Sequence, residues 1–191
     1  MGRAFYMNYS RAQRGLRLMV FAALLSALSI VCGKYLAFNM GEFLRFSFEN
    51  LPIIFAGIAF GPIVGAAVGV VSDLLGCVLV GYAIIPLITV GAGAIGFVSG
   101  IFYFVPRPKS KPLYIAYFSL TLFLAHLVGS VIIKSFGLSS FYDMPLIVLM
   151  LWRLLNYVIV GSVEGVLLYH LLRNKMLSRE INNIMKRKNT K

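Results

Sequence analysis

Between residues 50 and 105 the chain carries a single charged side chain, Asp73. Soluble domains are about one quarter charged residues, so an uncharged stretch of this length indicates a hydrocarbon environment. A helix needs about 20 mostly apolar residues to cross a bilayer, and this stretch therefore holds two or three spans. The whole chain has 191 residues and is 60% hydrophobic. That length fits about six spans with little left over, which predicts one membrane domain.

The basic residues decide how many spans the uncharged stretch contains. The net charge is +12, and most of the basic residues lie before residue 18, between residues 107 and 111, and after residue 172. Basic segments that flank apolar spans are normally cytoplasmic, which explains the charge better than a nucleic-acid partner does. If these three segments share one side of the membrane, an even number of spans must separate the first two. One span before residue 50 and three within residues 50–105 satisfy this condition.

Glycine and proline indicate where the spans break. Gly61-Pro62 and the segment from Gly81 to Pro86 interrupt the uncharged stretch, and proline does not continue a helix without disturbing it. The predicted fold is an all-α integral membrane protein, a compact bundle of six transmembrane helices with both termini cytoplasmic. The expected spans are 18–38, 48–61, 62–80, 85–105, 113–134 and 145–172, between basic tails at 1–17 and 173–191.

Three polar residues are expected at similar depth inside this bundle. With a rise of ~1.5 Å per residue, Arg153 lies ~12 Å below the outer end of the last span, His126 ~12 Å below Lys134, and Asp73 ~16 Å from Pro62. Ionisable groups in a membrane usually face a bundle interior or a wet cavity. Simpler alternatives remain: an Arg153–Asp73 structural pair, a core histidine bonded to a backbone carbonyl, and a Lys134 that extends to the interface.

The last span presents Arg153, Asn156 and Tyr157 on one face, because they follow helical spacing. Arginine can hold a carboxylate through two hydrogen bonds. Arg45 and Lys134 near the outer rim would attract an anion, while Phe48 and Tyr157 could stack on a flat ring. The sequence therefore predicts an outward-facing pocket for a flat, anionic ligand.

Catalytic signatures are missing from this sequence. It has no metalloprotease, nucleophile-elbow or P-loop motif, so we expect no enzyme activity, no metal and no cofactor. A chain without a P-loop also cannot drive transport by hydrolysing ATP itself. On the first span Ala22, Ala23 and Ala27 form a face of small residues. That face could pack within the bundle or contact another membrane subunit.

The stretch from Arg45 to Pro52, continuing through Gly61-Pro62 to Ser72-Asp73, resembles the substrate-binding S-components of energy-coupling factor (ECF) transporters. Among these it is most similar to the folate-specific type. The resemblance implies a vitamin bound at the outer face of a prokaryotic cell membrane. It also implies docking through the first-span alanines onto a scaffold membrane protein that carries two ATPases. An S-component for pantothenate or thiamin, or a membrane-embedded enzyme, are the alternatives.

Overall fold

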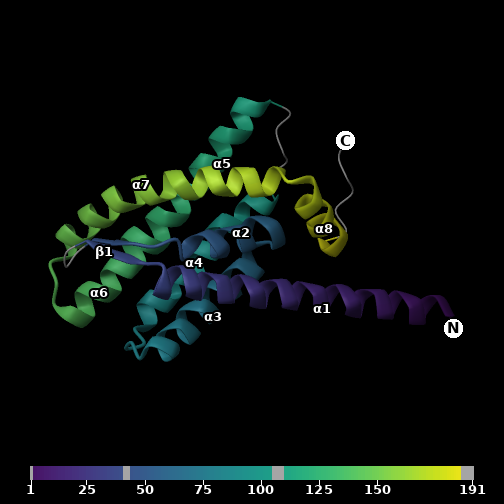
Figure 1. Cartoon of the computed structure of the whole chain (residues 1–191), viewed down its shortest axis with the longest axis horizontal. Coiled ribbons are helices and arrows are strands. Elements are labelled where there is room, and N and C mark those ends of the chain that lie inside the picture. Colours follow the sequence, from purple (N-terminus) through teal and green to yellow (C-terminus); the bar gives the residue numbers. More distant parts are fainter. Residues whose placement is uncertain (1, 41–43, 105–109, 186–191) are drawn as a thin grey trace.

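The computed structural model describes residues 2–40, 44–104 and 110–185, and nearly all of them are helical (Figure 1). The chain begins with α1 (Gly2–Ile30), which continues into the π-helical η1 (Val31–Tyr35), and two strands follow, β1 (Phe38–Met40) and β2 (Leu44–Phe46). Next come α2 (Asn50–Phe60), α3 (Pro62–Val80) and α4 (Pro86–Ile101), which ends in the 3₁₀ turn η2 (Phe102–Phe104). Helix α5 (Lys111–Ala125) continues through the π-helical η3 (His126–Ile133) into α6 (Lys134–Tyr142), and α7 (Leu146–Arg173) and α8 (Lys175–Met185) complete the chain order.

The predicted helical membrane class is confirmed. Within the described residues, five helices are long and apolar enough to cross a bilayer, and the shorter apolar α2 lies among them. Three features were not predicted. A two-stranded antiparallel hairpin follows α1, with Asn39 opposite Arg45. Helix α1 begins at Gly2 and α8 spans Lys175–Met185, so each of the two expected basic tails contains helix.

Each break within the uncharged stretch is made by a glycine and a proline. Gly61 has a φ of 97°, which L side chains rarely adopt, and Pro62 follows at the first position of α3. Proline suits that position because its missing N–H would have no helical partner there. Gly81 ends α3 in the left-handed conformation with a φ of 73°, and Pro86 begins α4. These turns fold α2, α3 and α4 against one another.

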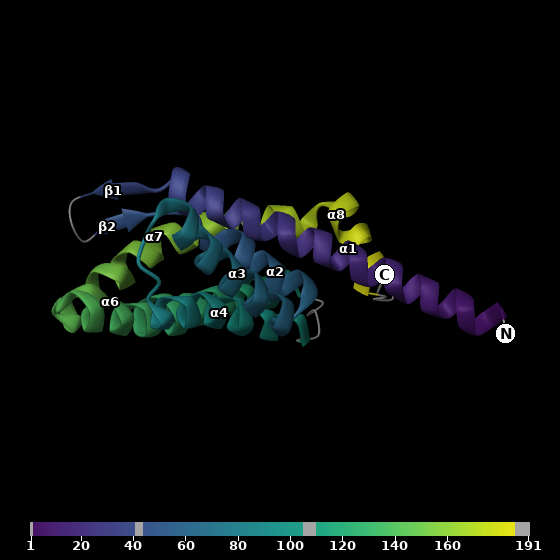
Figure 2. The same cartoon turned by 90° about the horizontal axis from the view of Figure 1, so that it is seen from below.

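The bundle is arranged around α2, which is buried from Pro52 to Phe60. Helices α1, α3 and α4 pack beside it, and the long α5–η3–α6 unit and α7 complete the bundle (Figure 1). The β1–β2 hairpin lies at the end opposite α8 and the first turns of α1 (Figure 2). At the terminal end α8 packs against α1, where Arg17 lies 3.7 Å from Glu180. We call these two ends the hairpin end and the terminal end.

Helices α3 and α4 approach so closely that side chains are excluded between them. A Cβ atom added at Gly96 would collide with the backbone of Gly65, and one added at Gly69 would collide with the carbonyl group of Ala92. Backbone atoms cannot move aside to admit a Cβ atom as a flexible side chain can. Small residues allow membrane helices to pack in such close contact.

Gly96→Ala is therefore expected to lower the melting temperature of the detergent-solubilised protein strongly, because α3 and α4 must separate to admit the methyl group. Gly15→Ala is the matched control, since a Cβ there meets nothing within 4 Å. In a helix interior this control should be neutral or stabilising by up to about 1 kcal/mol. Thermal unfolding followed by fluorescence measures both, and equal melting temperatures would contradict the packing argument.

Candidate functional site

A buried ion pair lies in the half of the bundle nearer the hairpin. Lys134, at the first position of α6, is only 3% exposed, and its Nζ lies 2.8 Å from Oε1 of Glu49. Glu49 ends the segment that leads from β2 into α2, so the pair joins the hairpin segment to the fifth span. A buried lysine is stable only with such a partner. Lys134 therefore does not extend to the membrane interface, and that alternative is wrong.

Close contact with the end of α1 holds Glu49 in place. The Ser29 hydroxyl donates to the Glu49 carbonyl oxygen at 2.7 Å. A Cβ at Gly33 would lie 2.7 Å from the Glu49 Cβ and 2.8 Å from its Oε2, so only glycine fits there. The π-helical η1 contains Gly33, which brings this backbone against the carboxylate. The sequence patterns did not predict this pairing of Glu49 with Lys134.

The ion pair lines a small cavity together with Asp73 and Lys34. The hydroxyl of Thr89 donates to Asp73 Oδ2 at 2.7 Å, and the Lys34 ammonium lies 5.2 Å from the centre of the Tyr82 ring. The cavity measures about 10 Å³. That is about the volume which one water molecule requires. Two cations and two carboxylates therefore line a space of about the size of one water molecule.

Arg153 and Asp73 do not form the structural pair that the sequence left open. Arg153 Nη1 instead donates to the backbone carbonyl oxygen of Ser130 at 2.9 Å, which ties α7 to η3. Asn156 lies one helical turn further along α7 and is 6% exposed. The guanidinium thus spans the two helices while remaining half-buried.

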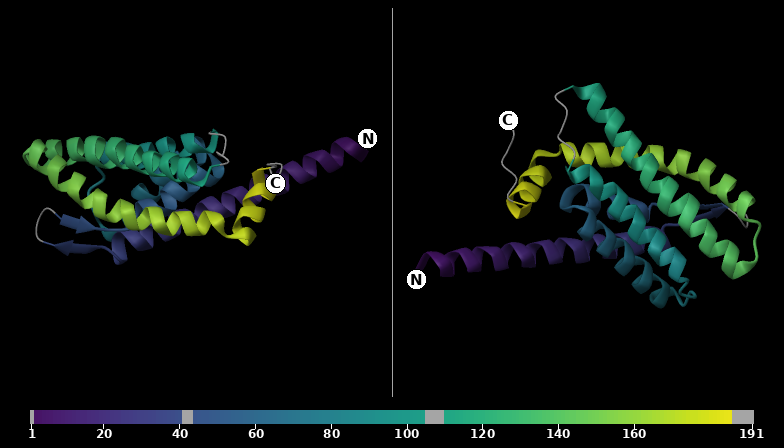
Figure 3. Two further views of the ribbon diagram at one scale, coloured as in Figure 1. Left: turned by 90° about the horizontal axis from the view of Figure 1, so that it is seen from above. Right: turned by 180° about the vertical axis from the view of Figure 1, so that it is seen from behind.

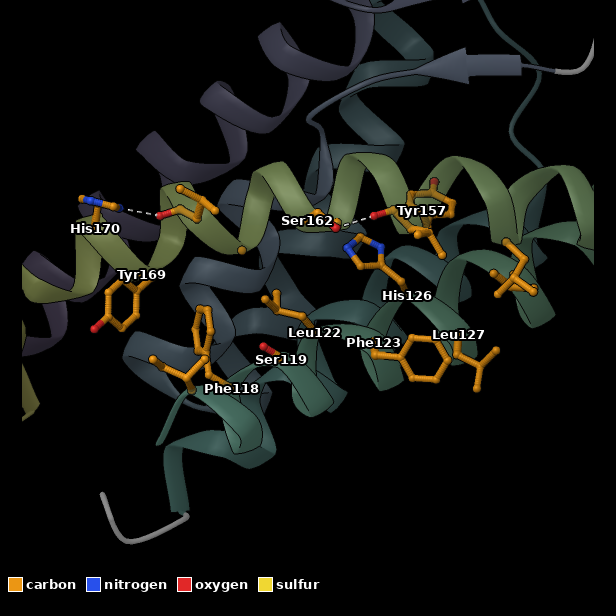
Figure 4. Close-up of a pocket in the computed structure, with 17 residues that line it drawn as sticks. Phe118, Ser119, Leu122, Phe123, His126, Leu127, Tyr157, Ser162, Tyr169 and His170 are labelled. Carbon is orange, nitrogen blue, oxygen red and sulfur yellow. Dashed lines mark hydrogen bonds between the residues drawn. The ribbon is translucent and has the colours of Figure 1, made fainter. Parts of the chain in front are cut away.

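His126 belongs to a different part of the bundle from Asp73. Its Nε2 lies 2.8 Å from Oε2 of Glu164, and both side chains are buried. The Tyr157 ring stacks on the imidazole with centres 4.7 Å apart. Both rings line an apolar groove between α5–η3 and α7 (Figure 4). The expected convergence of His126 with Asp73 fails because equal depth does not set the direction in which a helix presents a side chain.

His126→Leu is expected to destabilise the protein, because it leaves the Glu164 carboxyl group without its partner in an apolar interior. Leaving a buried polar group unpaired costs about 1–3 kcal/mol. His170→Leu is the control, since His170 is exposed and its Nδ1 bonds to the Val166 carbonyl oxygen of its own helix. A melting temperature of His126→Leu equal to that of the control would contradict a structural role for the pair.

The remaining predicted residues are placed as follows. The backbone of Arg45 lies in β2, but its side chain is outside the described residues. Phe48 is half-buried in the segment that joins β2 to α2. Ala23 and Ala27 are exposed on α1, whereas Ala22 packs against the hydrophobic core. The alanine face is therefore divided, and two of its three members are accessible to another subunit.

The fold and these sites define a class of protein: a multi-pass helical membrane protein with a small charged cavity in the half of the bundle nearer the hairpin. The family model for the substrate-specific component of ECF transporters matches residues 17–172. The chain belongs to this family of transport subunits.

Relatives of known type support the same assignment. The folate transporter FolT of Clostridium novyi (strain NT) is 24% identical over 152 residues, which cover 79% of this chain and 85% of the relative. A crystal structure of FolT bound with folic acid matches with a TM-score of 0.65 and 25% identity, over 80% of this chain and 90% of the other. A structure of the S component of a bacterial ECF transporter matches with a TM-score of 0.58 over 91% of this chain and 99% of the other; at 19% identity it supports the fold alone.

Proposed function

We propose that this chain is the folate-binding S-component of an ECF transporter in a prokaryotic plasma membrane. It captures the vitamin at the outer face and delivers it with a separate scaffold membrane protein and two ATPases. The observation that carries the proposal is the similarity to FolT bound with folic acid, which extends over most of both chains. The chain itself contains no P-loop, so the energy must come from a partner.

The charged cavity fits the chemistry of folate, which combines a flat pterin, an aromatic linker and two carboxylates. Lys134 is suited to hold a carboxylate, and Arg153 could form a bidentate contact with one. Asp73 is suited to accept hydrogen bonds from pterin N–H groups. Asn156 completes this set, and Arg45 and Phe48 would contribute from the hairpin segment. We assign packing roles to His126 and Tyr157, because the His126 imidazole is already bonded to the Glu164 carboxyl group.

Ligand entry would require the hairpin segment to move. The cavity of about 10 Å³ is far smaller than the ~300–1,000 Å³ of ligand pockets. The Glu49 carboxylate already neutralises Lys134, so an incoming carboxylate competes with Glu49 for the same ammonium group. Displacement of Glu49 would release β2 and the residues that join it to α2, and would enlarge the cavity.

Titration calorimetry of the purified protein tests the ligand directly. We expect tight binding of folate and no binding of thiamin or pantothenate. A cationic ligand such as thiamin cannot pair with the cations of the site, and a small ligand such as pantothenate cannot reach both the cations and the flat aromatic surface. Protein purified without added ligand should also carry pterin absorbance. Tight binding of another vitamin with no response to folate would reassign the ligand while keeping the S-component class.

A further inference from the structure

An apolar groove of about 530 Å³ runs along the side of the bundle between α5–η3 and α7 (Figure 4). Phe118, Leu122 and Leu127 line it from α5–η3, and Leu154 and Val158 line it from α7. The two helical units meet at the hairpin end and diverge toward the terminal end (Figure 3). Cavities of this volume commonly hold whole small molecules.

Three of the polar side chains that line the groove form hydrogen bonds within the protein. His126 bonds to Glu164, the Ser162 hydroxyl donates to the Val158 carbonyl oxygen at 2.6 Å, and His170 Nδ1 lies 2.9 Å from the Val166 carbonyl oxygen. The walls therefore offer a ligand mainly aliphatic and aromatic surface. Hydrocarbon fits such a surface, whereas a polar vitamin would lose its hydration there without compensation.

The groove is as long as a lipid chain requires. From Leu154 to His170 helix α7 rises about 24 Å at ~1.5 Å per residue. One leaflet of a bilayer contributes about half of the ~30 Å hydrocarbon thickness. A chain lying in the groove would therefore stay in contact with protein across its whole leaflet, and its headgroup would lie at the terminal end.

Basic residues surround the terminal end of the groove. Arg173 Nη1 lies 3.2 Å from the Tyr169 hydroxyl, and Tyr169 and His170 line the groove there. On the opposite wall Lys111 precedes the lining residue Ile115 by one helical turn. Both cations are exposed, and in the described part of the chain neither pairs with a carboxylate. They are available to a phosphate, which arginine in particular binds well.

We propose that the groove holds an acyl chain of an anionic phospholipid whose headgroup lies at the terminal end beside Arg173, with Lys111 on the opposite wall. This lipid comes from the leaflet at the terminal end. The basic residues favour an anionic lipid over a zwitterionic one, and the fit of the chain in the groove slows its exchange with bulk lipid. The site is separate from the Glu49–Lys134 cavity and stands whether or not the vitamin is folate.

Native mass spectrometry of the full chain tests this, with phosphatidylglycerol and phosphatidylcholine of identical chains added to the detergent-purified protein. Phosphatidylglycerol is expected to be retained at a roughly 25-fold lower concentration, since each lysine or arginine near an anionic headgroup contributes about fivefold. Arg173→Gln combined with Lys111→Gln should abolish that difference. Arg179→Gln removes an exposed arginine of α8 outside the groove and should preserve it.

Ser162→Trp fills the groove from α7 and should abolish tight phosphatidylglycerol retention, while Ala67→Trp, at an exposed position of α3, should not. The melting temperature of each variant shows that it is folded. Equal retention of the two lipids by the unmodified protein would overturn the proposal, and so would unchanged retention by Ser162→Trp. Light scattering that showed a dimer dissociated by Ser162→Trp would also overturn it, since the occupant would then be a second copy of the chain.

Discussion

Ala23→Trp and Ala27→Trp are expected to abolish vitamin uptake while changing the affinity of the isolated subunit for folate by less than about twofold. The two alanines are exposed on α1 and four residues apart, so they lie on one face of the helix. Small side chains allow another membrane helix to come close, and an indole ring prevents this contact. Uptake of labelled folate by cells that contain the complete transporter measures the first effect, and calorimetry on the purified subunit measures the second.

Two further substitutions distinguish docking from packing. Ala116→Trp adds the same ring at an exposed position of α5, on another side of the bundle, and should leave both uptake and binding intact. Ala22→Trp enters the core and should lower the melting temperature instead. If Ala23→Trp and Ala27→Trp abolish folate binding together with uptake, these residues support the bundle itself and α1 is not the docking surface.

The boundaries between α2, α3 and α4 could be predicted because their signals are local. Gly61-Pro62 and the segment from Gly81 to Pro86 fix chain reversals through backbone geometry alone, and the observed helices end and begin there. Helices α2, α3 and α4 carry a single charged side chain, Asp73, which is typical of helices in a hydrocarbon environment. The side of the membrane on which the termini lie remains a prediction from the positive charges.

The details of the site could not be predicted because they depend on contacts between distant segments. Glu49 and Lys134 are 85 residues apart, and their pairing requires both the η1 turn at Gly33 and the start of α6. The helical rise predicts how deep a residue lies along its helix, but it does not predict the rotation of that helix about its own axis. For this reason Asp73 and His126 were expected at similar depth, whereas in the structure Asp73 bonds to Thr89 and His126 to Glu164. The short hairpin also has too few residues to show strand alternation.

Lys134→Ala is expected to weaken folate binding by about 30-fold or more, because removing one member of a buried charge pair costs about 2–5 kcal/mol. The same change should lower the melting temperature, since Glu49 loses its partner. Glu49→Gln should also lower stability, but it removes the competitor for the Lys134 ammonium group. Folate affinity should therefore be maintained or increased in Glu49→Gln. Calorimetry and thermal unfolding of the purified variants measure the two quantities separately.

The double variant Lys134→Met with Glu49→Met separates the structural role of the pair from its role in binding. Apolar residues of similar volume often replace a buried ion pair without loss of stability. The double variant should therefore recover the melting temperature lost by Lys134→Ala, yet bind folate no better than that variant. Recovery of both properties would show that Lys134 only supports the fold and that the vitamin carboxylate is held elsewhere. Recovery of stability alone would identify the ammonium group as the ligand contact, because the interior would be intact and the cation missing.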